Sequence, residues 1–190
     1  MLVLASQSPR RKQLLEMMGL EFQTIVADVD ESMDSTIDIQ DEIMRISRSK
    51  ALTVQAKCTQ EDIIIAADTM VCIDGKRLGK PKNAEDAFAM LRQLSGREHH
   101  VISGLSVVQG QRVESAVEIT ALHFRPLCDA EIAAYIATGE PMDKAGAYGI
   151  QGKAAMFAQK MCGDYYNVMG LPVCRLTAML RGFGVKLLDC

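Results

Sequence analysis

The amino-acid sequence predicts an α/β protein built around a mixed β-sheet. Its 190 residues, 48% of them hydrophobic, suffice for the core of one domain or of two closely packed lobes. Strand-like and helix-like segments alternate as βαβαβ over the first half of the chain, which favours a sheet covered by helices. Two long apolar runs joined by a short turn follow, and they predict an antiparallel pair. The sheet is therefore expected to be mixed rather than wholly parallel.

Each expected element of the first half has a local signal. Residues 2–5 form a short apolar run, and Ser8 followed by Pro9 predicts the start of a helix that Gly19 ends. Apolar residues at helical spacing predict a long helix over residues 39–57. The other expected features are strands at 21–26 and 62–74, an acidic loop at 27–35 and a hairpin-type turn at 74–75.

In the second half, Asn83 predicts the cap of a helix that ends at Ser95–Gly96. Residues 101–108 and 113–124 are expected to form the antiparallel pair. The remaining expected elements are a helix beginning at Asp129 and ended by Gly139, a Gly-rich loop at 140–152, a strand over 154–161, a turn at 162–164 and a helix from Pro172 to Arg181. Because no repeat or linker interrupts the chain, we predict a single domain over residues 1–190.

The composition argues against several classes of protein. A formal net charge of −3 disfavours a general nucleic-acid coat or a membrane-surface module, since both carry a basic excess. The N-terminal apolar stretch is too short for a signal peptide and lacks a basic region before it, and no run approaches a membrane span. We therefore expect a cytoplasmic protein without nucleic-acid or membrane partners. Its six cysteines are expected to be reduced and mostly to fill the core, at positions 58, 72, 128, 162, 174 and 190.

Two adjacent arginines, Arg10 and Arg11, stand in the first turn of the first expected helix. A helix N-terminus offers unpaired N–H groups, and the hydroxyls of Ser6 and Ser8 lie close by in the sequence. Guanidinium groups bind phosphate oxygens through paired hydrogen bonds. The stretch therefore predicts an anion site, with a pair of ordinary surface arginines as the alternative.

Two charged residues, Lys50 and Asp68, interrupt apolar patterns. Lys50 lies in the middle of the apolar stripe of its helix, which is formed by Ile39, Ile43, Ile46 and Val54. Asp68 interrupts a core-like strand. A buried ammonium group requires an anionic partner, and a buried carboxylate requires a cation or a metal ion. The alternatives are a lysine at the rim of its stripe and an aspartate exposed at a strand end.

Three further segments carry weaker signals. Residues 75–83, GKRLGKPKN, fail as a Walker A loop because the glycine spacing is one residue short, which leaves Lys80 as either a phosphate-binding or a surface lysine. In residues 143–152, either the glycines let the backbone approach a flat ligand that Gln151 reads, or the loop is flexible. Three carboxylates of the acidic loop could hold a cation or be solvated: Asp28, Asp30 and Glu31.

Taken together, these groups describe one ligand, a nucleoside polyphosphate with a metal ion. Cationic side chains would bind the phosphates, carboxylates would hold the metal and the Gly/Gln loop would contact the base. The three histidines, at positions 99, 100 and 123, show no metal-binding pattern and are assigned no role.

The sequence resembles the Maf family of nucleoside triphosphate pyrophosphatases over essentially its whole length. The matching stretches occur in the family's order: LASQSPRRKQLL at 4–15, RSKA at 48–51, AADTMV at 66–71, GKPKNAEDAFAMLRQLSG at 79–96, DKAGAYGIQG at 143–152 and VMGLP at 168–172. The resemblance implies a Maf/ITPase-like α/β fold, in which an elongated mixed sheet is flanked by helices and a central cleft separates two lobes.

The resemblance also implies an activity, the hydrolysis of a nucleoside triphosphate to the monophosphate and pyrophosphate with Mg²⁺ or Mn²⁺. It makes Asp68 the proton acceptor and places Glu31 with Asp68 at the metal. Four positions match the family's phosphate-binding residues: Ser6, Arg11, Lys50 and Lys80. Three positions match the branch that cleaves dTTP and UTP: Arg10, Thr69 and Gln151.

The same resemblance implies a homodimer that removes non-standard or excess pyrimidine nucleotides. Two alternatives stay open at this point. One is a nucleotide-binding regulator of cell division and septum formation, and the other is a pyrophosphatase for another, modified nucleotide.

Overall fold

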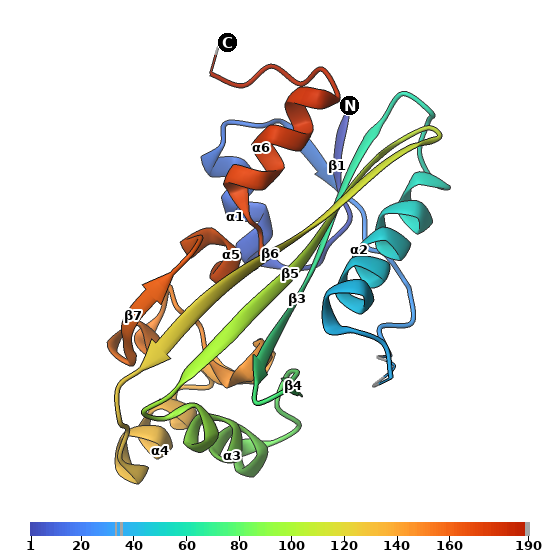
Figure 1. Cartoon of the computed structure of the whole chain (residues 1–190). Helices are drawn as coiled ribbons and strands as arrows, with labels where there is room; N and C mark the ends of the chain where they lie inside the picture. Colours follow the sequence, from blue (N-terminus) through green and yellow to red (C-terminus); the bar gives the residue numbers. More distant parts are fainter. Residues whose placement is uncertain (33, 35, 189–190) are drawn as a thin grey trace. The chain divides into compact units, whose positions relative to one another are not determined.

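The structure, a computed structural model, describes residues 1–32, 34 and 36–188. Within them, seven strands form one mixed sheet in the order β2-β1-β3-β5-β6-β7, with β4 paired to β3 (Figure 1). The strands are β1 (Leu2–Leu4), β2 (Phe22–Thr24), β3 (Ile63–Ile73), β4 (Lys76–Leu78), β5 (Glu98–Gln109), β6 (Arg112–Phe124) and β7 (Ala158–Cys162). The helices are α1 (Pro9–Met17), α2 (Ile39–Gln55), α3 (Ala84–Leu94), α4 (Asp129–Ala137), α5 (Tyr165–Met169) and α6 (Val173–Gly182). Three short 3₁₀ helices complete the chain: η1 (Glu140–Asp143), η2 (Ala145–Ala147) and η3 (Lys153–Met156).

The strand pairings confirm the expected mixed sheet. β1 runs parallel to both β2 and β3, whereas β4 is antiparallel to β3 and β7 is antiparallel to β6. Gly110 and Gln111 alone connect β5 to β6, so these two long neighbours form a hairpin. The α/β class predicted from the order of elements is therefore confirmed, with helices flanking the sheet.

The chain divides into two compact units. The first unit comprises residues 1–68, 103–118 and 170–190, and the second comprises residues 69–102 and 119–169. The boundaries fall inside β3, β5 and β6, so each of these strands contributes residues to both units.

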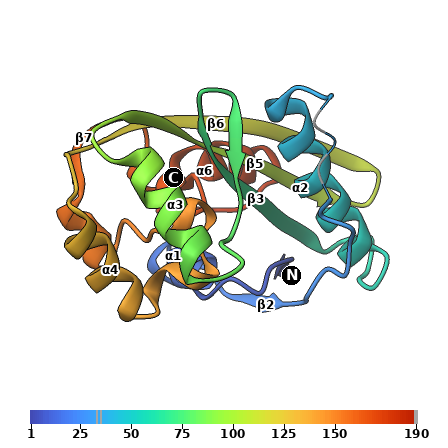
Figure 2. The same cartoon turned by 90° about the horizontal axis from the view of Figure 1, so that it is seen from below.

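In the first unit, α2 packs against the sheet (Figures 1 and 2). Ala51 and Val54 of α2 share one apolar cluster with strand residues Val3, Ile64, Ala66 and Val108. The helix comes so close to β5 that a Cβ atom at Gly104 would lie 2.3 Å from the carbonyl oxygen of Ile43. Ser47 of α2 and Ser106 of β5 are fully buried, and their hydroxyl oxygens lie 2.9 Å apart. Close contact and a satisfied polar pair thus fix α2 on β5.

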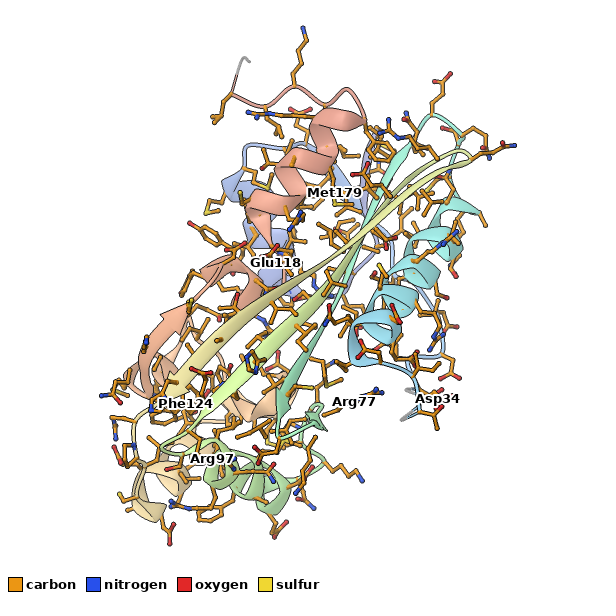
Figure 3. The ribbon with its side chains drawn as sticks, viewed as in Figure 1. Asp34, Arg77, Arg97, Glu118, Phe124 and Met179 are labelled. Carbon is orange, nitrogen blue, oxygen red and sulfur yellow. The ribbon has the colours of Figure 1, made fainter. Side chains whose placement is uncertain are left out.

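In the second unit, α3 packs beside α4, and both contribute to an apolar core (Figure 2). Phe124, labelled in Figure 3, lies at the centre of this core with the His99 ring 4.8 Å and the Tyr148 ring 4.9 Å away, both edge-on. Such edge-to-face contacts stabilise aromatic clusters beyond the area they bury. The core therefore extends to Tyr148, which lies in the Gly-rich loop.

Most predicted elements are present, and their end signals act as expected. Ser8 caps α1 with Pro9 at its first position, and the side chain of Asn83 accepts a hydrogen bond from the N–H of Asp86 at 2.8 Å. The prediction of a strand over 154–161 was wrong at its start, because residues 153–156 form η3 and β7 begins at Ala158. The short elements β4 and α5 were not predicted, since three and five residues show no periodicity.

The prediction that the cysteines mostly fill the core was wrong. None of the five described cysteines is buried: Cys58 and Cys72 are half-buried, and Cys128, Cys162 and Cys174 are exposed. Cys190 lies outside the described residues. Across the described ranges, no helix combines the length and apolar character that crossing a bilayer requires.

Candidate active site

Lys50 and Asp68 meet in the first unit because of the periods of a helix and a strand. Side chains two residues apart on a strand share a face, so Asp68 follows Ile64 and Ala66 on the face that α2 covers. Lys50 lies one helical turn before Val54, which belongs to that apolar cluster. The helix therefore places the ammonium group of Lys50 next to the carboxylate of Asp68, with Nζ 2.6 Å from Oδ1.

The exposure of Lys50 and Asp68 decides whether each is a buried charge or a charge at the surface, which the sequence left open. Asp68 lies in the middle of β3 with its side chain 13% exposed, and the side chain of Lys50 is 8% exposed. Neither group is therefore a solvated surface charge. A buried lysine and a buried carboxylate each carry a desolvation cost, which their hydrogen bond offsets.

Glu31 adds a second carboxylate to the same ammonium group. It lies in the loop between β2 and α2, and its Oε1 is 2.8 Å from Nζ of Lys50. Its side chain is 57% exposed, so Glu31 faces solvent while Asp68 is enclosed. One lysine thus holds two carboxylates that come from segments far apart in the sequence.

Arg11 forms the cationic side of the same region. Its guanidinium donates to Oγ of Ser6 at 3.2 Å and to the carbonyl oxygen of Gly170 at 2.7 Å. Ser6 also accepts from the N–H of Ser8 at 3.1 Å, so its hydroxyl oxygen ties the loop before α1 to the guanidinium. The contact with Gly170 was not anticipated, and nothing local in the sequence indicates it.

The electrostatics of Arg11 connect it with the lysine–carboxylate cluster. Burial lowers the pKa of the Arg11 guanidinium, the negative charge of Asp68 acts in the opposite direction, and the neighbouring Arg10 lowers it further. The charge of Glu31 acts in the same direction as that of Asp68, but the pKa of Arg11 remains lowered overall. Arginine remains charged at neutral pH despite such shifts. The first unit therefore brings the buried Lys50 and the half-buried Arg11 close to two carboxylates.

The other predicted site residues lie in the second unit. Thr69 directly follows Asp68 on β3, so its side chain leaves the strand on the opposite face. Lys80 is exposed in the segment between β4 and α3, and Gln151 is exposed in the turn between η2 and η3. The structure thus brings together Ser6, Arg11, Glu31, Lys50 and Asp68 with Arg10 beside them. A common site that includes Thr69, Lys80 and Gln151 stays a prediction.

The donor set fits a divalent cation that is held only partly by protein. Within the described ranges, no group of three or more His, Cys, Asp and Glu side chains is arranged to hold a metal ion. Two carboxylates do converge, those of Glu31 and Asp68. Mg²⁺ typically binds through one or two carboxylates together with waters and substrate phosphates. The residues present therefore fit such an ion. In this structure, the ammonium group of Lys50 contacts both carboxylates.

Two glycines of the Gly-rich loop are in close contact with side chains of the same unit. A Cβ atom at Gly152 would lie 2.3 Å from Oε1 of Glu140, and one at Gly149 would lie 2.6 Å from Cε of Lys144. The protein's own side chains thus pack directly on this backbone. Glu140 is a further residue that sequence reasoning missed, because a single glutamate before a proline carries no distinctive pattern.

The chain is similar to known proteins over nearly all of its length. Residues 1–183 match the family described as Maf-like protein. The dTTP/UTP pyrophosphatase of Carboxydothermus hydrogenoformans is 49% identical over 183 residues, which cover 95% of this chain and 97% of the relative. The dTTP/UTP pyrophosphatase of Geobacillus sp. is 46% identical and covers 96% and 98% of the two chains. That of Bacillus velezensis is 44% identical and covers 97% of each.

Solved structures show the same fold at much lower sequence identity. The Ham1 protein of Staphylococcus aureus superposes with a TM-score of 0.52 at 14% identity, covering 95% of this chain and 98% of that one. A HAM1 protein from Coxiella burnetii gives a TM-score of 0.50 at 14% identity, with the same coverage.

Proposed function

Because the chain belongs to the Maf-like protein family, we propose that it is a nucleoside triphosphate pyrophosphatase that hydrolyses dTTP and UTP. The products are the nucleoside monophosphate and pyrophosphate. The observation that carries the proposal is the cluster of Lys50, Asp68 and Glu31 beside the half-buried Arg11. The names of the relatives, dTTP/UTP pyrophosphatase, support the substrate.

In the proposed reaction, Asp68 accepts the proton of a water molecule. The water oxygen forms a bond to the α-phosphorus, and the bond from that phosphorus to the α–β bridging oxygen breaks. Pyrophosphate leaves with the electron pair of the broken bond. A carboxylate placed as general base typically contributes about 10²- to 10⁴-fold in rate.

The cationic residues stabilise charge on the triphosphate. Arg11 and Ser6 bind phosphate oxygens at the start of α1, where helix N–H groups favour anions. Lys50 and Lys80 bind the leaving pyrophosphate. Asp68 and Glu31 would hold Mg²⁺ or Mn²⁺, which would further neutralise charge on the phosphate oxygens. Preorganised charge of this kind usually supplies most of the catalysis in phosphoryl chemistry.

Base selection is assigned to Arg10, Thr69 and Gln151. A pocket built to hydrogen-bond one base edge rejects other bases because its polar groups are then left unpaired. A homodimer, a cytoplasmic location, a cleft between the units and any part in septum formation stay predictions.

The test is the release of pyrophosphate from a panel of nucleotides with Mg²⁺ or Mn²⁺. Wild-type protein is expected to act on dTTP and UTP, and in ¹⁸O-labelled water the label should enter the monophosphate. Asp68→Asn keeps the size of the side chain and is expected to lower kcat by at least 10²-fold. Asp41→Asn, the same change at an exposed position of α2, is the matched control and should retain activity.

The outcomes separate this proposal from its alternatives. Release of orthophosphate, or label in pyrophosphate, contradicts attack at the α-phosphorus. Binding of dTTP without turnover under any metal favours a nucleotide-binding regulator. Faster turnover of a purine or modified nucleotide favours a pyrophosphatase for that base.

A further inference from the structure

Two side chains of the second unit anchor the turn that carries Gln151. The N–H of Gly149 donates to Oη of Tyr135 at 3.1 Å, and the N–H of Lys153 donates to Oε2 of Glu140 at 3.1 Å. These two anchored amides lie on either side of Gln151 in the sequence. The N–H of Gly152 donates to the carbonyl oxygen of Gly149 at 3.0 Å and closes the turn between them.

The two anchors are also joined to each other. The hydroxyl of Tyr135 donates to Oε1 of Glu140 at 2.8 Å. Burial raises the pKa of Tyr135 well above its usual value, so this hydroxyl stays protonated and remains a donor. Glu140 thus uses one carboxylate oxygen for Tyr135 and the other for the backbone of Lys153, so one hydrogen-bonded network contains both anchors.

Packing reinforces these hydrogen bonds. Tyr135 is only 4% exposed, and its ring lies edge-on to that of Phe157 with the centroids 5.1 Å apart. The carboxylate of Glu140 lies directly against Gly152, where a Cβ atom would approach its oxygens to 2.3 and 2.6 Å. Lys144 holds the backbone of Glu140 through a hydrogen bond from Nζ to the carbonyl oxygen at 2.7 Å. The turn is therefore supported internally at both ends.

Gln151 itself is exposed, so the direction of its side chain depends on the backbone that carries it. A side-chain amide discriminates between bases only when its donor and acceptor are held in position, because hydrogen bonds weaken steeply with distance and angle. We propose that Tyr135 and Glu140 are positioning residues that fix the Gln151 turn and thereby set the preference for the nucleobase. This inference rests on the proposed function, in which Gln151 contacts the base.

The experiment compares Tyr135→Phe and Glu140→Gln in the full-length chain with the wild type. Tyr135→Phe removes both the acceptor of the Gly149 N–H and the donor to Glu140. Glu140→Gln leaves a single oxygen where two accept from Tyr135 and Lys153. Both changes preserve the shape of the side chain. For dTTP, KM is expected to rise roughly five- to tenfold, while kcat stays within about twofold. For GTP, whose base the turn is not built to read, kcat/KM should change little, so the preference for dTTP over GTP falls.

Matched controls exist in the same unit. Tyr165→Phe and Glu98→Gln make the same chemical changes at exposed positions and should keep the wild-type preference. Amide hydrogen exchange at Gly149 and Lys153, read by NMR, should accelerate in both anchor variants and in neither control. This second readout detects the loss of anchoring without any catalytic turnover.

Three results would overturn the inference. Anchor variants that keep the wild-type preference for dTTP show that the anchors do not position the base contact. Equal losses of kcat for every nucleotide show a general structural role instead. Wild-type protein that releases no pyrophosphate from any nucleotide overturns the proposed function, and this inference with it.

Discussion

At the scale of single residues, the two adjacent arginines of α1 are assigned different roles. The guanidinium of Arg11 donates to Ser6 and to the backbone of Gly170, and its burial lowers its pKa. This fixed position suits a residue that holds the triphosphate, whereas Arg10 is assigned to base selection.

Separate alanine substitutions test this division. Arg11→Ala is expected to raise KM roughly tenfold or more for every triphosphate, because a charge-assisted contact to phosphate is lost whatever the base. Arg10→Ala should change the ratio of kcat/KM for dTTP and GTP more than Arg11→Ala does. Steady-state kinetics with both nucleotides measure this. Equal effects of Arg10→Ala on all nucleotides would contradict its role in selection.

His99 is a buried titratable residue outside the candidate site. It is fully buried in the second unit, and its Nε2 lies 2.9 Å from Oη of Tyr148. Burial raises the pKa of Tyr148, so the tyrosine hydroxyl stays protonated beside the imidazole. The pKa of His99 is lowered to about 4, mainly by burial, with smaller contributions from the positive charges of His100 and His123, while the backbone of Arg97 acts in the opposite direction.

This shift predicts a loss of stability in acid. Between pH 6.5 and about 4, the unfolded chain binds a proton at His99 and the folded chain does not, so stability falls as pH falls through this window. The contribution of His99 is about 3 kcal/mol. Urea unfolding at several pH values should show a smaller loss over the window for His99→Gln than for the wild type. The exposed His100→Gln should keep the wild-type slope, and an unchanged slope in His99→Gln would contradict the assignment.

At the scale of elements, α2 is the part on which the candidate site depends most. It carries Lys50 and rests on β5 at Gly104, where the backbone of Ile43 lies too close for any side chain. The hydroxyl chain continues from Ser106 to Ser115 of β6, with the two oxygens 2.9 Å apart. The distance from helix to sheet therefore determines whether the ammonium group reaches Asp68.

Gly104→Ala should separate α2 from the sheet. A Cβ atom would lie 2.3 Å from the carbonyl oxygen and 2.6 Å from the carbonyl carbon of Ile43, and helix backbone yields less readily than a flexible side chain. The expected loss in the free energy of unfolding is about 3 kcal/mol. Urea denaturation measures it, with Gly79→Ala as the control because a Cβ there meets nothing within 4 Å. Equal stability of the two variants would contradict the close packing of α2.

The elements also show which local signals suffice for prediction. Helix caps and tight turns act within a few residues, so the sequence alone indicates them. Examples are the caps at Ser8 and Asn83, the turn from β3 to β4 and the turn from β5 to β6. α5 has five residues and β4 has three, which is too short for a periodic pattern. The burial of the cysteines was predicted wrongly because hydrophobic character alone does not determine on which face of an element a residue lies.

At the scale of the whole molecule, the fold is shared by proteins whose sequences differ at most positions. Ham1 proteins at 14% identity superpose along nearly the full chain, whereas the dTTP/UTP pyrophosphatases described above retain 44% to 49% identity. A mixed sheet with flanking helices needs only the right pattern of apolar residues and turns, which many sequences supply. Specific charged residues at defined positions carry the further information about activity.

The sequence by itself determined the class of the fold, the ends of its main helices and the identity of two charged residues inside apolar patterns. Those features are local, because periodicity, caps and desolvation costs act along one segment. Only the tertiary structure decided that Lys50 pairs with both Asp68 and Glu31, that Arg11 contacts Gly170, and that Glu140 supports the turn of Gln151. Such contacts join segments far apart in the chain, and they form only once helices and strands pack at distances of a few ångströms.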